Sequence, residues 1–168
     1  YPPALSSSNS IFAVFSNAAA SSISYAKQQR IQYSIGLKLC LLSIPGTIIG
    51  AYISSDITPS LFKILFALIL ISASIYIFSK RKIEPKSHNL SKQIMILSVG
   101  ASFLAGIISG LFGVGGGIIF VPLMVIAMGL SMKNAAPTSQ FILLFVSVSA
   151  LVTHSILGHP DFYQALLL

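Results

Sequence analysis

Apolar residues along this chain occur in long runs that carry few charges and are separated by short polar segments. Each run is close to the roughly 20 residues that a helix needs to cross a bilayer core. The predicted spans are residues 4–25, 33–54, 60–79 and 135–157, with a longer apolar stretch at 93–130 and the start of a further run at 161–168. This pattern predicts an all-α polytopic membrane protein built as a helical bundle.

The stretch 93–130 does not fit a single span. As one straight helix it would be about 57 Å long, whereas a bilayer core is about 30 Å thick. It is also slightly too short for two full spans and a turn. We therefore predict a broken, re-entrant pair of short helices that meet inside the membrane at Gly113–Gly117. Non-helical backbone at that depth is tolerated where it is buried in protein or lines a wet cavity, and broken helices mark substrate sites in transporters.

The centre of this stretch, Gly106–Pro122, reads GIISGLFGVGGGIIFVP. Glycine lets a ligand approach the main chain, because there is no Cβ in the way. A helix that begins near Ile118 leaves its first N–H groups unpaired at the positive end of its dipole, which suits an anion. The alternative is close helix packing, which we expect for Gly106 and Gly110. The predicted substrate-binding glycines are Gly113, Gly115, Gly116 and Gly117.

Composition and charge support the membrane assignment. The 168 residues are 55% hydrophobic and 8% charged, with a mean hydropathy of +0.90, whereas soluble domains carry about 25% charge. The net charge of +7 does not indicate nucleic-acid binding, because the basic residues lie in short loops and form no face with stacking aromatics. Segment 80–92 holds five of the ten Lys and Arg residues. We predict that it is a cytoplasmic loop of a multi-pass cell-membrane protein.

The spans lack the side chains that an intramembrane enzyme needs. They contain no Asp or Glu, and His154 is their one histidine, so we expect no enzymatic activity. Cys40 lies in an apolar run and reads as a packing residue. No Cys/His cluster is present, so we expect no metal and no cofactor. We expect His154 and His159 at the membrane interface, with a proton-relay role for His154 as the alternative.

A weak internal repeat relates two of the predicted spans. Residues 9–25 resemble residues 138–154 at an offset of 129, since both begin with a polar pair and place Phe two residues after the serine. An odd number of crossings between them predicts inverted repeats, a common transporter design. We divide the chain into 1–79 (the remainder of a first repeat, with three helices), 80–92 (the basic loop) and 93–168 (the start of a second repeat). The two polar pairs are further candidate substrate ligands: Asn9, Ser10, Thr138 and Ser139.

These residues together resemble the TauE/SafE family, also called the sulfite exporter-like family. The shared signature is a GxxSGxxGxGGGxxxxP run followed by Ala-x-x-Thr-Ser, present here as Gly106–Pro122 and Ala135–Ser139. The resemblance implies two similar halves of about four helices each. The first half would have its own glycine pair ahead of this chain, and Asn9-Ser10 would replace its Thr-Ser. The resemblance therefore implies that the chain is a partial unit.

The resemblance also implies a permease or exporter for sulfite, sulfonates or related sulfur-containing organic acids. Its partners would be a small anion and the lipid bilayer. A passive channel, or a structural membrane subunit without carrier activity, is the alternative. The substrate, the direction of transport, the coupling ion and assembly into a homo-oligomer stay open at this point.

Overall fold

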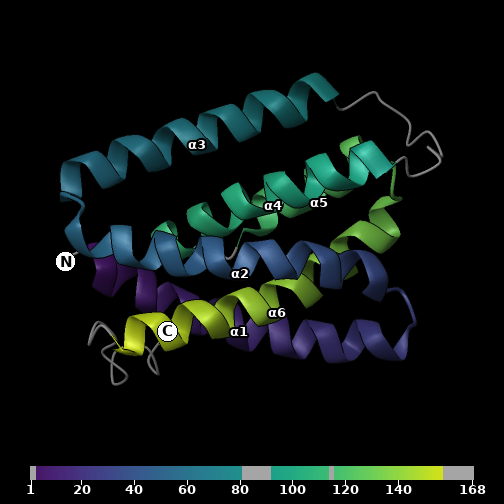
Figure 1. The fold of residues 1–168 in the computed structure, drawn as a ribbon, viewed down its shortest axis with the longest axis horizontal. Coiled ribbons are helices and arrows are strands. Elements are labelled where there is room, and N and C mark those ends of the chain that lie inside the picture. The colour runs from purple at the N-terminus through teal and green to yellow at the C-terminus, as the bar shows by residue number, and fades with distance from the viewer. Residues whose placement is uncertain (1–2, 81–91, 114–115, 157–168) are drawn as a thin grey trace.

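The computed structural model describes residues 3–80, 92–113 and 116–156, and folds them into helices joined by short connections, without strands (Figure 1). The elements are α1 (Pro3–Lys27), α2 (Tyr33–Asp56), α3 (Pro59–Lys80), α4 (Lys92–Phe112), α5 (Gly117–Pro122), the π-helix η1 (Leu123–Ala127) and α6 (Met132–Ile156). The predicted helical class is confirmed. The predicted loop 80–92 and further run 161–168 lie almost wholly outside the described residues.

Within the part of the chain that the structure describes, three helices are long and apolar enough to cross a membrane: α2, residues 93–112 of α4, and α6. Of the other expected spans, α1 has sufficient length, but its Ser and Asn residues make it less apolar. In α3 the apolar helical stretch is Pro59–Ser72. Residues 132–134, which the sequence pattern places in a loop, form the first turn of α6, because the N–H groups of Asn134 and Ala135 both donate to the Ser131 carbonyl.

The predicted pair of short helices is unequal in the structure. Its first arm, α4, has 21 residues and can cross the bilayer alone, because nothing interrupts its helical backbone before Gly113. Its second arm is short: the six residues of α5 continue directly into the five residues of η1. The interruption expected at Gly113–Gly117 is therefore present, but it follows a full-length helix.

Two GxxxG faces hold α2 and α4 together. A Cβ added to Gly46 or Gly50 of α2 would meet the carbonyl oxygen of Phe103 or Ile107 of α4. Conversely, a Cβ added to Gly106 would meet the Ser43 carbonyl of α2, and one added to Gly110 would meet the Thr47 carbonyl. The residue numbers rise together in these contacts, so the two helices run parallel. Small residues permit this backbone approach, which supports the packing role expected for Gly106 and Gly110.

The helices α1 and α6 run antiparallel, and the beginning of α6 lies beside the beginning of α2 (Figure 1). The ring of Tyr33 at the start of α2 packs edge-on against Phe141 of α6, with 5.3 Å between the ring centroids. The buried core includes α5 and η1, because Phe120, Met124 and Met128 are almost completely buried among residues of α2 and α6.

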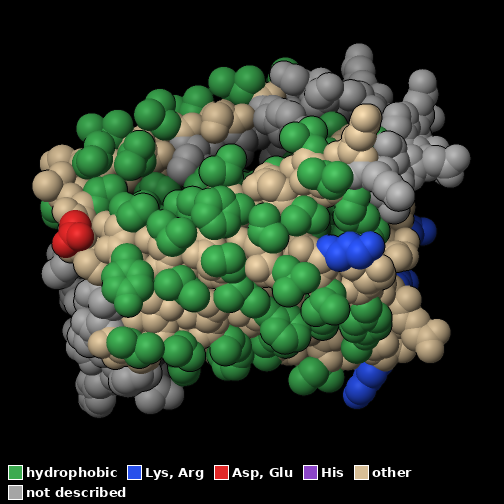
Figure 2. Space-filling model, viewed as in Figure 1, with side chains coloured by type: hydrophobic (Ala, Val, Ile, Leu, Met, Phe, Trp, Pro, Cys, Tyr) green, Lys and Arg blue, Asp and Glu red, His purple; other side chains and the backbone are tan. Residues whose placement is uncertain are grey.

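The outside of the bundle is apolar and its described charges lie at the ends. Large hydrophobic side chains are exposed along α2, α3 and α6. Figure 2 shows them spread over most of one face, with Lys and Arg side chains gathered at one end and one acidic side chain at the other. A surface this apolar is expected for a protein whose outer face contacts lipid. Most described basic residues lie at one end, and Lys63, near the start of α3, lies toward the other end with Asp56. This asymmetry agrees with a positive-inside topology.

Candidate substrate site at the glycine break

The break between α4 and α5 depends on left-handed backbone. The φ angle is 69° at Gly113 and 66° at Gly116, values that L-residues with a Cβ rarely adopt. At the start of the break the Gly113 N–H donates to the Ser109 carbonyl at 2.9 Å, which closes the last turn of α4. Both glycines are buried. The chain therefore reverses inside the protein at positions where the sequence supplies the residue type that the turn requires.

Two main-chain N–H groups are left for a ligand at the start of α5. The N–H groups of Ile119 and Phe120 both donate to the Gly116 carbonyl, at 2.9 and 3.0 Å. Helix geometry gives the preceding N–H groups, those of Gly117 and Ile118, no intrahelical acceptor. Among the described residues of the break, these two groups are the main-chain donors that the predicted anion site would use. Because α5 is only six residues long, individual hydrogen bonds matter more here than a long helix dipole.

Two glycines of the break, Gly116 and Gly117, differ from the packing glycines in what a side chain would meet. A Cβ at Gly116 would lie 2.8 Å from Phe120 Cε2, and the Phe120 ring is fully buried. A Cβ at Gly117 would meet Leu143 Cδ1 at 3.3 Å, without a positive φ. Gly116 is thus constrained by conformation and by space, whereas Gly117 tolerates a small shift of a leucine side chain. Gly115, another predicted ligand, lies outside the described residues.

An aromatic cover from α3 closes one side of the break. The rings of Phe62 and Phe66 lie 5.0 and 5.3 Å from that of Phe112 at the end of α4. Beneath them is a cavity of about 10 Å³ that includes Gly116 in its wall and is lined by apolar residues. That volume is close to the minimum for one water molecule. On the α3 side, the break is closed in this conformation.

The structure places the predicted polar pairs in different surroundings. Thr138 is fully buried, and its hydroxyl donates to the Asn134 carbonyl at 2.7 Å and accepts from the Gln32 N–H at 3.0 Å. It therefore anchors the α1–α2 connection. Ser139, also buried, donates to the Ala136 carbonyl at 2.7 Å. It lies one turn before Leu143, the residue beside Gly117, so Ser139 is the member of the pair on the face toward α5.

The first polar pair lies on α1. Ser10 is exposed, and only the backbone of Asn9 is among the described features. The structure therefore brings together Gly113, Gly116 and Gly117, with Ser139 one turn away on a neighbouring helix. For Thr138 the recorded hydrogen-bond partners lie elsewhere, at Asn134 and Gln32, and the binding roles of all the predicted residues stay predictions.

The comparison with known proteins decides the family. The family described as Sulfite exporter TauE/SafE matches residues 1–168, the whole chain. The chain belongs to the TauE/SafE family. This TauE/SafE chain is 30% identical over 183 aligned positions to the probable membrane transporter protein YunE of Bacillus subtilis, covering 99% of the chain and 67% of YunE. Membership in a transport family also excludes the enzyme class and implies a small-molecule substrate.

Other relatives carry equally general descriptions. A probable membrane transporter protein of Methanocaldococcus jannaschii is 27% identical over 86% of the chain and 54% of its own length. One of Xylella fastidiosa is 26% identical over 90% of the chain and 58% of its own length. The TauE/SafE chain thus spans between about half and two thirds of the relatives it matches. No solved structure gives a significant match.

Two buried polar side chains of this TauE/SafE protein were not predicted as site residues. Gln140, next to Ser139, has a buried Oε1 atom without a hydrogen-bond partner in the described part of the chain. An amide in an otherwise charge-free span is the sequence signal for it. His154 is fully buried, with Nε2 3.3 Å from the Gly110 carbonyl oxygen. We expected this histidine at the membrane interface, and the structure places its side chain inside the protein. His159 lies outside the described residues.

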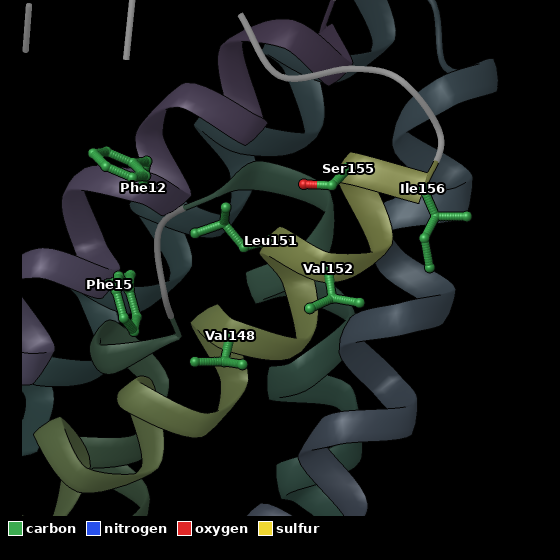
Figure 3. A pocket seen from close by; sticks show the side chains of 7 residues that line it. All are labelled: Phe12, Phe15, Val148, Leu151, Val152, Ser155 and Ile156. Carbon is green, nitrogen blue, oxygen red and sulfur yellow. The ribbon is translucent and has the colours of Figure 1, made fainter. Parts of the chain in front are cut away.

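A larger cavity lies elsewhere and has the wrong chemistry for an anion. It is a groove of about 480 Å³ between α1 and α6 (Figure 3). Its lining is apolar apart from one hydroxyl: Phe12, Phe15, Val148, Leu151, Val152, Ser155 and Ile156. Such a surface suits a hydrocarbon chain or another helix. We therefore do not assign the transported substrate of this TauE/SafE protein to the groove.

Proposed function

We propose that the chain is part of a permease for small sulfur-containing anions, such as sulfite or sulfonates, and that it binds the anion at the glycine break. The observation that carries this proposal is the buried left-handed turn between α4 and α5, which leaves the Gly117 and Ile118 N–H groups without an intrahelical acceptor. A charge-assisted hydrogen bond is roughly twice as strong as a neutral one. Two such bonds favour an oxyanion over a neutral solute.

The apolar surroundings of the break also favour selectivity for a partly desolvated anion. The small cavity beside Gly116 is lined by apolar side chains, so an ion that enters loses water and gains few side-chain partners. Its hydrogen bonds are stronger there than in water because the local dielectric is low. Ser139 and Gln140 on α6 are candidates for additional hydrogen bonds after a rearrangement. The family name, together with these two N–H groups, is what suggests a sulfur oxyanion.

The proposed topology places the basic end of the bundle and residues 80–92 in the cytoplasm, in a cell membrane. We further propose that α1 and α6 are equivalent members of two inverted repeats. In support, residues 9–25 of α1 resemble residues 138–154 of α6 at the offset of 129, and the two helices run antiparallel (Figure 1). In such designs the substrate lies at the interface between repeats.

The test is transport by the complete protein in proteoliposomes. A carrier should take up labelled sulfite with saturation, and unlabelled sulfite inside the vesicles should accelerate entry by counterflow. Phosphate and acetate at equal concentration serve as control anions. Flux that rises linearly without counterflow would indicate the passive channel instead. Absence of sulfite and taurine flux, with intact monodisperse protein, would refute the proposed substrate class.

A further inference from the structure

The last turn of α4 ends with carbonyl groups that the helix itself cannot pair. The four final C=O groups of a helix lack an intrahelical donor. In α4 the first of them, on Ser109, accepts the Gly113 N–H. The backbone then turns left-handed at Gly113, and among the described residues no main-chain donor is recorded for the next carbonyl, that of Gly110. This carbonyl is in the interior of the protein, where an unpaired acceptor is costly.

A histidine from another helix reaches this carbonyl. The Nε2 atom of His154, in the last turn of α6, lies 3.3 Å from the Gly110 oxygen, and the His154 side chain is fully buried. A carbonyl oxygen only accepts hydrogen bonds, so Nε2 must carry the proton in this contact. The neutral imidazole is sufficient for this bond, and no buried charge is required.

We propose that His154 is a positioning residue that closes the C-terminus of α4 and thereby holds the glycine break in place. Two contacts link its hydrogen bond to the break. The Ser109 carbonyl, adjacent to Gly110, accepts the Gly113 N–H. A Cβ built on Gly116 would also lie within 3.4 Å of Ser109 Cβ. A shift of this helical turn therefore moves the segment that precedes the Gly117 and Ile118 N–H groups.

The opposite side of the same turn is already fixed. A Cβ at Gly110 would meet the Thr47 carbonyl of α2, so backbone packing holds α4 against α2. The hydrogen bond from His154 ties the turn to α6 as well. With both attachments, the end of α4 is held between two helices just before the chain reverses. The proposed role of His154 is to hold the geometry of the break. Only the expected effect of His154 substitutions on transport rests on the proposed anion site.

Three substitutions in the complete protein separate the effect of the His154 hydrogen bond from the effect of its side-chain volume. His154→Gln keeps an N–H donor of similar reach, whereas His154→Phe and His154→Met fill the space without one. For sulfite transport normalised to folded protein, we expect Phe and Met to lower Vmax/KM by about tenfold, equivalent to about 1.4 kcal/mol. The change should fall mainly on KM, and Gln should restore the value to within about threefold of the original.

A second readout does not depend on transport. In a Cys40→Ala background, Ser109→Cys reports access to the break through its rate of reaction with a small thiol reagent. This labelling rate should rise in the His154→Phe and His154→Met variants. In the His154→Gln variant it should stay close to the rate measured with His154. Equal labelling rates and equal transport across all variants would overturn the inference, as would a defect that Gln shares with Phe and Met. Donor-dependent labelling in a protein that transports no sulfite would keep the inference and refute the proposed function alone.

Discussion

The sharpest prediction concerns the different consequences of adding one methyl group at three glycines. Gly116→Ala places a Cβ at a φ of 66° and 2.8 Å from the buried Phe120 ring. Gly106→Ala instead drives a Cβ into the Ser43 backbone of α2. Gly100→Ala is the control, because a Cβ at that position of α4 meets nothing within 4 Å. We compare Gly116 with Gly106 because Gly106 lies farther from the break than Gly110.

The expected magnitudes follow from these contacts. Left-handed backbone costs an alanine about 1–2 kcal/mol, and the strain is relieved if the break shifts and moves the Gly117 and Ile118 N–H groups. Losing one charge-assisted hydrogen bond costs about 1.5–3 kcal/mol, which corresponds to a roughly 10- to 150-fold lower Vmax/KM for the anion. Gly116→Val should be worse, because a β-branched side chain is less tolerant of this conformation. Gly106→Ala should instead destabilise the α2–α4 interface by about 1–3 kcal/mol.

The assay is sulfite counterflow divided by the amount of monodisperse protein recovered from membranes. We expect Gly116→Ala to lower this specific activity with a modest loss of yield, Gly106→Ala to lower yield with near-normal specific activity, and Gly100→Ala to change neither. The same loss of specific activity at Gly106 and Gly116 would refute the division between packing and ligand-binding glycines. Normal specific activity in a well-folded Gly116→Val protein would remove the break from the substrate site.

Three further outcomes test the surroundings of the site and the topology. Thr138→Val should lower the free energy of unfolding by about 0.5–1.5 kcal/mol, because it removes the part-buried hydrogen bond from the Gln32 N–H. Thr138→Ser should retain most of the stability in thermal unfolding, and equal melting curves would contradict the anchoring role. Ser87→Cys, in the loop outside the described residues, should resist an impermeant thiol reagent in intact cells, and labelling from outside would invert the proposed topology. Phe66→Ala should open the aromatic cover and increase thiol labelling of a cysteine at Ser109, and an unchanged rate would show that α3 does not seal the break.

Hydropathy and glycine spacing predict the helices well, because length and apolarity decide whether a segment can cross a bilayer. The boundaries of α2 and α3 differ from the predicted spans by at most two residues. The unequal arms of the broken pair were harder to foresee. The apolar pattern continues unchanged across residues 93–112, and the end of α4 is set by a φ angle at Gly113, a property that hydropathy does not encode.

The sequence predicts the candidate site only in part, because it does not specify how the backbone groups of the turn are paired. The glycine run predicts exposed backbone, but it does not say which N–H groups are already paired within the turn, as those of Ile119 and Phe120 are. Likewise, adjacent hydroxyls in a helix point about 100° apart, so Thr138 and Ser139 face different neighbours. One secures the connection before α2, and only the other lies on the side of α5. Spacing along the chain could not separate these two roles.

The proposed inverted repeat has a structural consequence for the groove between α1 and α6. The offset of 129 pairs Phe12 of α1 with Phe141 of α6. Phe141 is covered by α2, since the Tyr33 ring packs against it and a Cβ on Gly36 would lie 2.9 Å from its ring. Phe12 instead lines the open apolar groove (Figure 3). Equivalent helices therefore have unequal neighbours within the described chain. Because the relatives are longer than this chain, the repeat requires that a counterpart of α2 occupy the groove beside Phe12 in the complete protein.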